Sequence, residues 1–178
     1  MMNWTCVPFN ELSTRQLYDV LALRSEVFVV EQNCVFLDID GMDPQVWHLL
    51  GDGDDGRLKA YARLLPPGMK SPTDAVIGRV VTSPAARSGG VGRALMAEAV
   101  AHCERLWPGQ AITLHAQAHL NRFYGSFGFV QIAEPYLEDG ILHIEMQKCS
   151  PQSAQAPRPP EGVEQARGGP SLAQETPQ

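Results

Sequence analysis

The 178-residue sequence has no hydrophobic run long enough to cross a membrane, and its start lacks the basic and apolar segments of a secretory leader. Its four cysteines include no C-x-x-C pair, which disfavours a metal site or a disulfide framework. Positive charge is also scarce: 14 lysines and arginines stand against 20 aspartates and glutamates, giving a net charge of −6. These absences predict a cytoplasmic protein that binds neither membranes nor nucleic acid.

A change of composition divides the chain near residue 148. Residues 1–148 carry the aromatic and branched apolar side chains of a globular domain, and the chain as a whole is 44% hydrophobic. Residues 149–178 are rich in proline and glutamine and contain no aromatic residue. Such a segment buries too little apolar surface to offset its ordering entropy, so we predict a disordered tail. A tail that recruits partners to a scaffold is the alternative.

Strand and helix patterns alternate along residues 1–148, which is typical of an α/β fold. Ser13 and Gln16 have the spacing of a capping box and predict a helix that begins there. Gly128 stands where a helix end needs a left-handed residue. The hydrophobic patterns predict further helices over 91–106 and around 121–124, and strands over 4–9, 46–51, 58–65, 75–82, 111–116, 129–132 and 141–147.

A glycine-rich turn, with Gly89, Gly90 and Gly92, joins a predicted strand to a predicted helix. Glycine lets the backbone approach a ligand closely, and the N–H groups and dipole of a helix N-terminus attract phosphate. Arg87 and Arg93 flank the turn and can pair with phosphate oxygens. The turn lacks the Lys-Ser or Lys-Thr pair of a P-loop and the glycine spacing of the dinucleotide fingerprint. A turn without a ligand is the structural alternative.

The R-x-x-G-x-G spacing of this turn resembles the coenzyme A diphosphate loop of the GCN5-related N-acetyltransferase (GNAT) superfamily. Downstream, the segment from Asn121 to Phe129 resembles a second GNAT segment, in which Asn121 and Tyr124 share one helix face. Segments 24–32, 37–43 and 138–144 resemble the ElaA-like subgroup. The resemblance spans residues 3–148 and implies a mixed, mostly antiparallel twisted sheet of about six to seven strands flanked by about four helices.

The resemblance implies transfer of an acetyl group from acetyl-CoA to a primary amine, by direct attack in a ternary complex. Tyr124 is implied as the general acid for the departing thiolate, and backbone N–H groups near Val81 as donors to the carbonyl oxygen. A non-catalytic acyl-CoA-binding regulatory module is the alternative function. The acceptor is unidentified, and the protein is expected to be a monomer or homodimer. The implied coenzyme contacts are Val80, Val81, Thr82, Arg87, Ser88, Gly89, Gly90, Val91, Gly92, Arg93 and Asn121.

The sequence leaves several candidates for the base that deprotonates the amine. A primary amine has a pKa near ~10.4, so at neutral pH it must lose a proton before it attacks. Glu31 is the first candidate, because a carboxylate after the first helix can face the acceptor and attract a cation. The alternatives are ordered water and three imidazoles, those of His48, His115 and His143.

Two patterns resemble metal sites but depart from them. Residues 38–43 have the carboxylate spacing of a calcium loop, yet the glycine is misplaced and Met42 stands where a ligand belongs. His115 and His119 have H-x-x-x-H spacing without the glutamate of a zinc-protease helix. We therefore predict no metal, a solvated acidic loop over 38–43, and two unrelated histidines.

Overall fold

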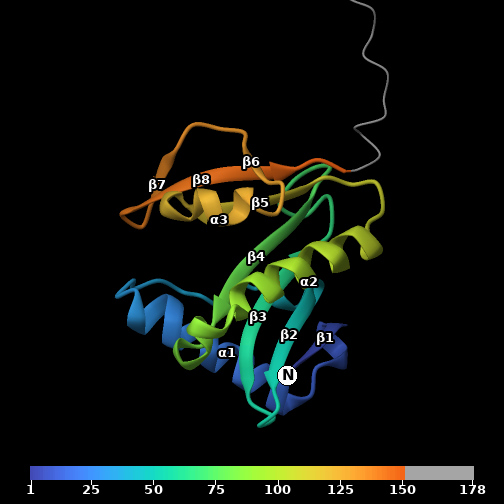
Figure 1. The fold of residues 1–178 in the computed structure, drawn as a ribbon, viewed down its shortest axis with the longest axis vertical. Helices are drawn as coiled ribbons and strands as arrows, with labels where there is room; N and C mark the ends of the chain where they lie inside the picture. The colour runs from blue at the N-terminus through green and yellow to red at the C-terminus, as the bar shows by residue number, and fades with distance from the viewer. Residues whose placement is uncertain (151–178) are drawn as a thin grey trace, which may run out of the picture.

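The computed structural model describes residues 1–150, so the tail predicted from residue 149 lies almost entirely outside the described residues. Within that range an eight-stranded sheet forms the centre of the molecule, in the order β1-β2-β3-β4-β5-β8-β6, with β7 also pairing with β8 (Figure 1). The described strands pair antiparallel except for β4 with β5. Their bounds are β1 Met2–Pro8, β2 Trp47–Gly53, β3 Leu58–Leu65, β4 Ala75–Thr82, β5 Ile112–Gln117, β6 Val130–Gln131, β7 Tyr136–Glu138 and β8 Ile141–Lys148.

Helices cover both faces of this sheet. Helix α1 (Thr14–Arg24) begins with the predicted capping box, in which both hydrogen bonds form, and continues into a π-helical segment, η2 (Ser25–Glu31). Helices α2 (Val91–Leu106) and α3 (Asn121–Gly125) share the main apolar core with Leu49, Leu64, Ile77 and Met146. Val20 and Leu23 of α1 pack on the opposite face, against Leu50, Tyr61 and Val81. The predicted fold class is confirmed, whereas β7 was not predicted.

Strands β4 and β5 are paired only at one end. Their register covers three residue pairs, the last of which joins Ile77 to Leu114, and beyond it the strands fan apart (Figure 1). At the paired end Asp74 accepts hydrogen bonds from Thr113 Oγ1 and Gln147 Nε2, both at 2.7 Å. These hydrogen bonds join β4, β5 and β8 at the point where β4 and β5 diverge. We call the space between the diverging strands the fork; along it, one edge of β4 is open.

Strand β4 also contains a bulge. Tyr61 pairs with Val81 and Arg63 pairs with Gly78, so two residues of β4, Arg79 and Val80, stand opposite a single residue of β3. Arg79 has a φ of 49°, in the left-handed region that residues other than glycine rarely adopt. The bulge lies within the open part of β4, beside the fork.

Candidate active site

The loop before α2 presents free backbone donors at the start of a 16-residue helix. Gly90 precedes the helix with a φ of 73°, no side chain caps the first turn, and no acidic residue lies in it. The N–H groups of Arg93 and Ala94 donate to the Gly90 carbonyl at 3.0 and 3.1 Å. Among the described residues, the N–H groups of Val91 and Gly92 have no recorded acceptor. Two donors and the positive end of the helix dipole thus remain available to an anion.

The two arginines of this loop have different partners. Arg87 donates two hydrogen bonds to the Glu31 carboxylate, at 2.7 and 2.8 Å. Arg93 donates to Ser126 Oγ at 3.2 Å and lies over the Phe127 ring, 5.4 Å from its centroid. The loop is therefore connected to η2 on one side and to the segment after α3 on the other.

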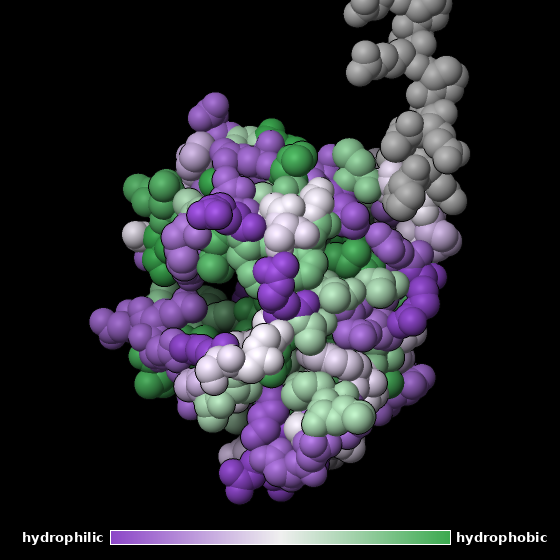
Figure 2. All heavy atoms as spheres, in the orientation of Figure 1, coloured by the Kyte–Doolittle hydropathy of each residue, from purple (hydrophilic) through white to green (hydrophobic). Residues whose placement is uncertain are grey.

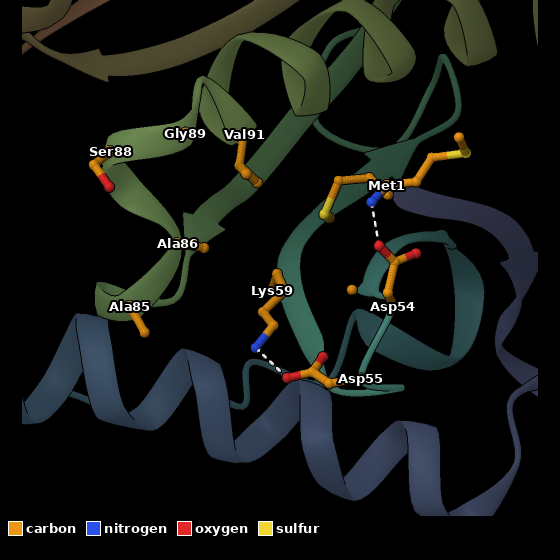
Figure 3. Close-up of a pocket in the computed structure, with 11 residues that line it drawn as sticks. Met1, Asp54, Asp55, Lys59, Ala85, Ala86, Ser88, Gly89 and Val91 are labelled. Carbon is orange, nitrogen blue, oxygen red and sulfur yellow. Dashed lines mark hydrogen bonds and ion pairs between the residues drawn. The ribbon is translucent and has the colours of Figure 1, made fainter.

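An open hollow of about 430 Å³ lies beside the loop (Figure 3). One wall is formed by loop residues such as Ala85, Ser88 and Val91, and the other by the β2–β3 turn with Lys59. The Nζ of Lys59 donates a hydrogen bond to the Asp55 carboxylate of that turn, at 2.8 Å. Among the described residues, none from α3 lines this hollow, so it is separate from the surroundings of Tyr124.

Tyr124 has the protonation state that a general acid needs. Its side chain is 7% exposed and packs edge-on against Phe123 and Phe129, and among residues 1–150 its hydroxyl has no recorded hydrogen-bond partner. Burial raises the pKa of Tyr124 to about 12, so it stays protonated at neutral pH. Asn121 lies one turn earlier on α3 and is exposed, whereas Tyr124 is buried.

The open edge of β4 offers main-chain donors. Ser83 N–H donates to the Lys59 carbonyl at 2.8 Å, so this N–H points toward β3. Because neighbouring residues of a regular strand alternate in direction, the N–H of Val81 also points toward β3, where Val81 pairs with Tyr61, whereas that of Thr82 points toward the fork. Of the two residues predicted as donors, Thr82 thus has its N–H on the open edge, whereas the N–H of Val81 is turned toward β3.

The candidate bases occupy different environments. Glu31 is held by Arg87, and that hydrogen bond lowers the pKa of the Glu31 carboxyl, which weakens it as a base. His48 is fully buried between the Tyr61 hydroxyl and the Asp43 carbonyl, at 2.8 and 2.9 Å, and burial lowers its pKa. Glu31 is therefore paired in this state, and His48 is enclosed by protein atoms.

His115 and His143 share one aromatic partner. His115 is exposed, and its Nδ1 lies 2.8 Å from the Tyr136 hydroxyl, while His143 stacks on the same ring at 5.9 Å between centroids. His115 follows Leu114, the last β5 residue that pairs with β4. The structure thus places His115 at the fork, next to a tyrosine that sequence reasoning did not single out.

The prediction of a solvated acidic loop is wrong. Asp38 and Asp43 are only 7% and 4% exposed. Arg24, on α1, binds both of them at 2.8 Å, and Arg63, on β3, binds Asp40 at 2.7 Å. These carboxylates neutralise the buried Arg24 and Arg63, so they form a structural ion-pair network. The partners in this network lie far apart in the sequence, so local sequence patterns did not predict it.

Three further properties concern residues 1–150 alone. None of the helices there is long and apolar enough to span a bilayer. No cluster of three or more histidine, cysteine, aspartate or glutamate side chains suited to a metal ion is found in this range. Its four cysteines are free thiols.

The fold agrees with comparisons to known proteins. Residues 49–150 match the family model described as "Acetyltransferase (GNAT) domain". The chain therefore belongs to the GNAT acetyltransferase family, whose fold is that of an acyl-CoA-dependent acyltransferase.

Within that family the chain belongs to the ElaA-like group. It is 48% identical to protein ElaA of Escherichia coli over 151 residues, which cover 82% of this chain and 95% of ElaA. The crystal structure of that ElaA superposes with a TM-score of 0.78, covering 83% of this chain and 99% of ElaA at 46% identity. An acyl-CoA N-acyltransferase structure from Pseudomonas aeruginosa gives a TM-score of 0.80 at 46% identity, covering 84% and 100% of the two chains.

Proposed function

We propose that the protein is an N-acetyltransferase that moves an acetyl group from acetyl-CoA to a primary amine by direct attack in a ternary complex. The observation that carries the proposal is the uncapped start of α2, where the N–H groups of Val91 and Gly92 face no protein acceptor among the described residues. Family membership supplies the ligand class, an acyl-CoA. A cytoplasmic location and a monomeric or homodimeric state are parts of the same proposal.

The coenzyme is proposed to lie across the loop and along the fork. Its diphosphate binds the main chain from Arg87 to Arg93, including Ser88, Gly89 and Gly90, with Asn121 as a further contact. Its pantetheine arm follows the open edge of β4. This path brings the thioester to the bulge, where the N–H groups of Val80 and Thr82 can donate to its carbonyl oxygen.

The chemistry follows from that placement. The deprotonated amine attacks the thioester carbon, and negative charge develops on the carbonyl oxygen, where main-chain donors stabilise it. Collapse of the tetrahedral intermediate breaks the C–S bond, and Tyr124 donates its proton to the departing sulfur. Since Glu31 is bound by Arg87 and His48 is enclosed, His115 at the fork is the favoured side chain for accepting the amine proton, directly or through water.

The first experiment places a charge at the proposed diphosphate site. A Cβ at Gly92 meets only Thr82 Cγ2, at 3.9 Å, so Gly92→Asp fits the free protein, and an acid in the first helical turn favours the helix. Repulsion of the diphosphate should weaken acetyl-CoA binding at least tenfold in calorimetry, about 1.4 kcal/mol, without lowering the melting temperature. Thr14→Asp places the same charge at the exposed start of α1 and should leave binding unchanged. Equal binding by Gly92→Asp and wild type would contradict the proposal.

A second experiment separates an enzyme from a binding module. Acetyl-CoA is incubated with spermidine, a small alkylamine, or peptides bearing a free N-terminus or a lysine, and free coenzyme thiol is measured. Amine-dependent thiol release supports the proposal. Tight acetyl-CoA binding without release for any amine would favour the non-catalytic regulatory module.

A further inference from the structure

Arg79 has an unusual backbone conformation in the middle of a strand. Its φ of 49° lies in the left-handed region, which is unfavourable for a long side chain. It is also one of the two β4 residues that stand opposite a single residue of β3. Such a conformation persists only where the surroundings hold it, so its contacts indicate what holds the bulge.

The Arg79 side chain is fixed by the segment that crosses this face of the sheet. Its Nε donates to Asp38 Oδ1 at 2.7 Å, and its Nη2 donates to the Asp38 carbonyl at 3.1 Å. Nη2 also lies 3.5 Å from Asp40 Oδ2, and the guanidinium lies over the Phe36 ring, 5.7 Å from its centroid. Four contacts from residues 36–40 therefore hold one side chain.

The partners of Arg79 are themselves fixed. Asp38 also accepts from Arg24 Nε at 2.8 Å, and Arg24 is fully buried on α1. Asp40 accepts two hydrogen bonds from Arg63, at 2.8 and 2.7 Å, and hydrogen bonding to Arg63 outweighs burial and lowers the pKa of Asp40. Asp40 is thus ionised at neutral pH, and the two carboxylates are anchored to both α1 and β3. The bulge is connected to two rigid elements through one arginine.

We propose that Arg79 is a positioning residue for the acyl group, and this inference rests on the proposed function. In this proposal its ion pairs hold the bulge in the arrangement that turns the Val80 N–H toward the fork, where the thioester carbonyl would lie. A strand without the bulge would return to regular alternation, and a shift of one residue reverses which N–H groups face the open edge. Arg79 acts through Val80 and does not itself contact the substrate.

The test separates the backbone conformation from the ion pairs. Glycine adopts positive φ without cost, so Arg79→Gly allows the bulge but removes everything that holds it. Arg79→Asn, which also tolerates this region, is measured beside it, and Arg79→Lys restores the charge. The readout is the infrared carbonyl stretch of [1-¹³C]acetyl-CoA bound to each protein, with binding measured separately by calorimetry. Donors at the carbonyl oxygen should lower this frequency relative to free acetyl-CoA.

In Arg79→Gly and Arg79→Asn we expect the frequency shift to fall by more than half, while the Kd for acetyl-CoA changes less than threefold, because the diphosphate loop is untouched. Arg79→Lys should restore part of the shift. Asp43→Asn is the matched control: Asp43 binds Arg24 and Arg63 but has no recorded contact with Arg79 among residues 1–150, so this variant should melt earlier yet keep the shift.

A wild-type shift in both Arg79→Gly and Arg79→Asn would overturn the role of Arg79. Failure of the proposed function is distinguishable, since the wild-type protein itself would then show no acetyl-CoA binding or no carbonyl shift. Loss of the shift in the two variants, with wild-type binding intact, supports the inference.

Discussion

The two sides of the fork differ in what they offer a substrate. The side from β1 to β4 is packed by α1 and by buried ion pairs among Arg24, Arg63 and their aspartates, and it presents main-chain N–H groups. The side from β5 to β8 carries Tyr124, Asn121 and His115 and presents side chains. A main-chain donor survives substitution by any residue except proline, and its position depends on its neighbours. A side-chain group can be removed alone, which predicts different mutational signatures on the two sides.

The largest effect should come from the side-chain half. Tyr124→Phe removes the proposed proton donor but keeps the ring in its apolar surroundings, so stability should change by less than ~1 kcal/mol. With chemistry rate-limiting, we expect kcat to fall about 10²-fold or more, and the KM for acetyl-CoA to change little. Tyr18→Phe, at a side chain 71% exposed on α1, is the control and should be silent. Wild-type turnover by Tyr124→Phe would remove this hydroxyl from the mechanism.

We expect a smaller effect at the contact between Glu31 and Arg87, beside the proposed coenzyme loop. Glu31 occupies Arg87 in the free protein and places a negative charge beside the proposed diphosphate. Glu31→Gln should therefore lower the KM for acetyl-CoA by about two- to fivefold, a range set by the modest worth of an exposed ion pair, with kcat unchanged. Steady-state kinetics over a range of pH provides the measurement. If kcat instead collapses and loses its dependence on a basic group, Glu31 is the base after all.

The smallest effect concerns the main-chain half, through stability alone. Burial lowers the pKa of His48 below the ordinary value of about 6.5, so below that pH the unfolded chain binds a proton that the folded protein does not. The free energy of unfolding should therefore decrease as pH falls below about 6.5, by up to ~1.4 kcal/mol per pH unit from this group. Urea unfolding of His48→Gln should lack this slope, although the variant is less stable at neutral pH.

The exposed His119 provides the comparison for that experiment. His119→Gln should keep the wild-type slope, because this substitution leaves the buried His48 in place. An unchanged slope in His48→Gln would mean that another group titrates in this window.

Local signals predicted much of the fold. The capping box at Ser13 and the apolar stripe of α2 depend on neighbours within a few residues, and both elements form as expected. The π-helical end of the first helix carries no such signal. Neither does the short strand β7, which exists because it pairs with β8.

The candidate site was predictable only in part, because some of its contacts join residues that are far apart in the sequence. Glycines and arginines close together in the chain indicated the loop that is proposed to bind the coenzyme. The Arg79 contacts instead join residues 41 positions apart, and the Glu31–Arg87 pair joins residues 56 apart. An acidic run has the same sequence pattern whether its carboxylates are solvated or paired with distant arginines. The prediction of a solvated loop over residues 38–43 was therefore wrong.

Asp74, the carboxylate at the base of the fork, differs from the aspartates that pair with Arg24 and Arg63. Asp74 accepts from two hydroxyl groups and an amide, those of Thr73, Thr113 and Gln147, all of which are uncharged. Dissolved ions screen attraction between exposed charges over roughly 8 Å at physiological ionic strength, but have little effect on short contacts of this type. Concentrated salt should consequently loosen the exposed contact between η2 and the loop while β4 and β5 stay joined.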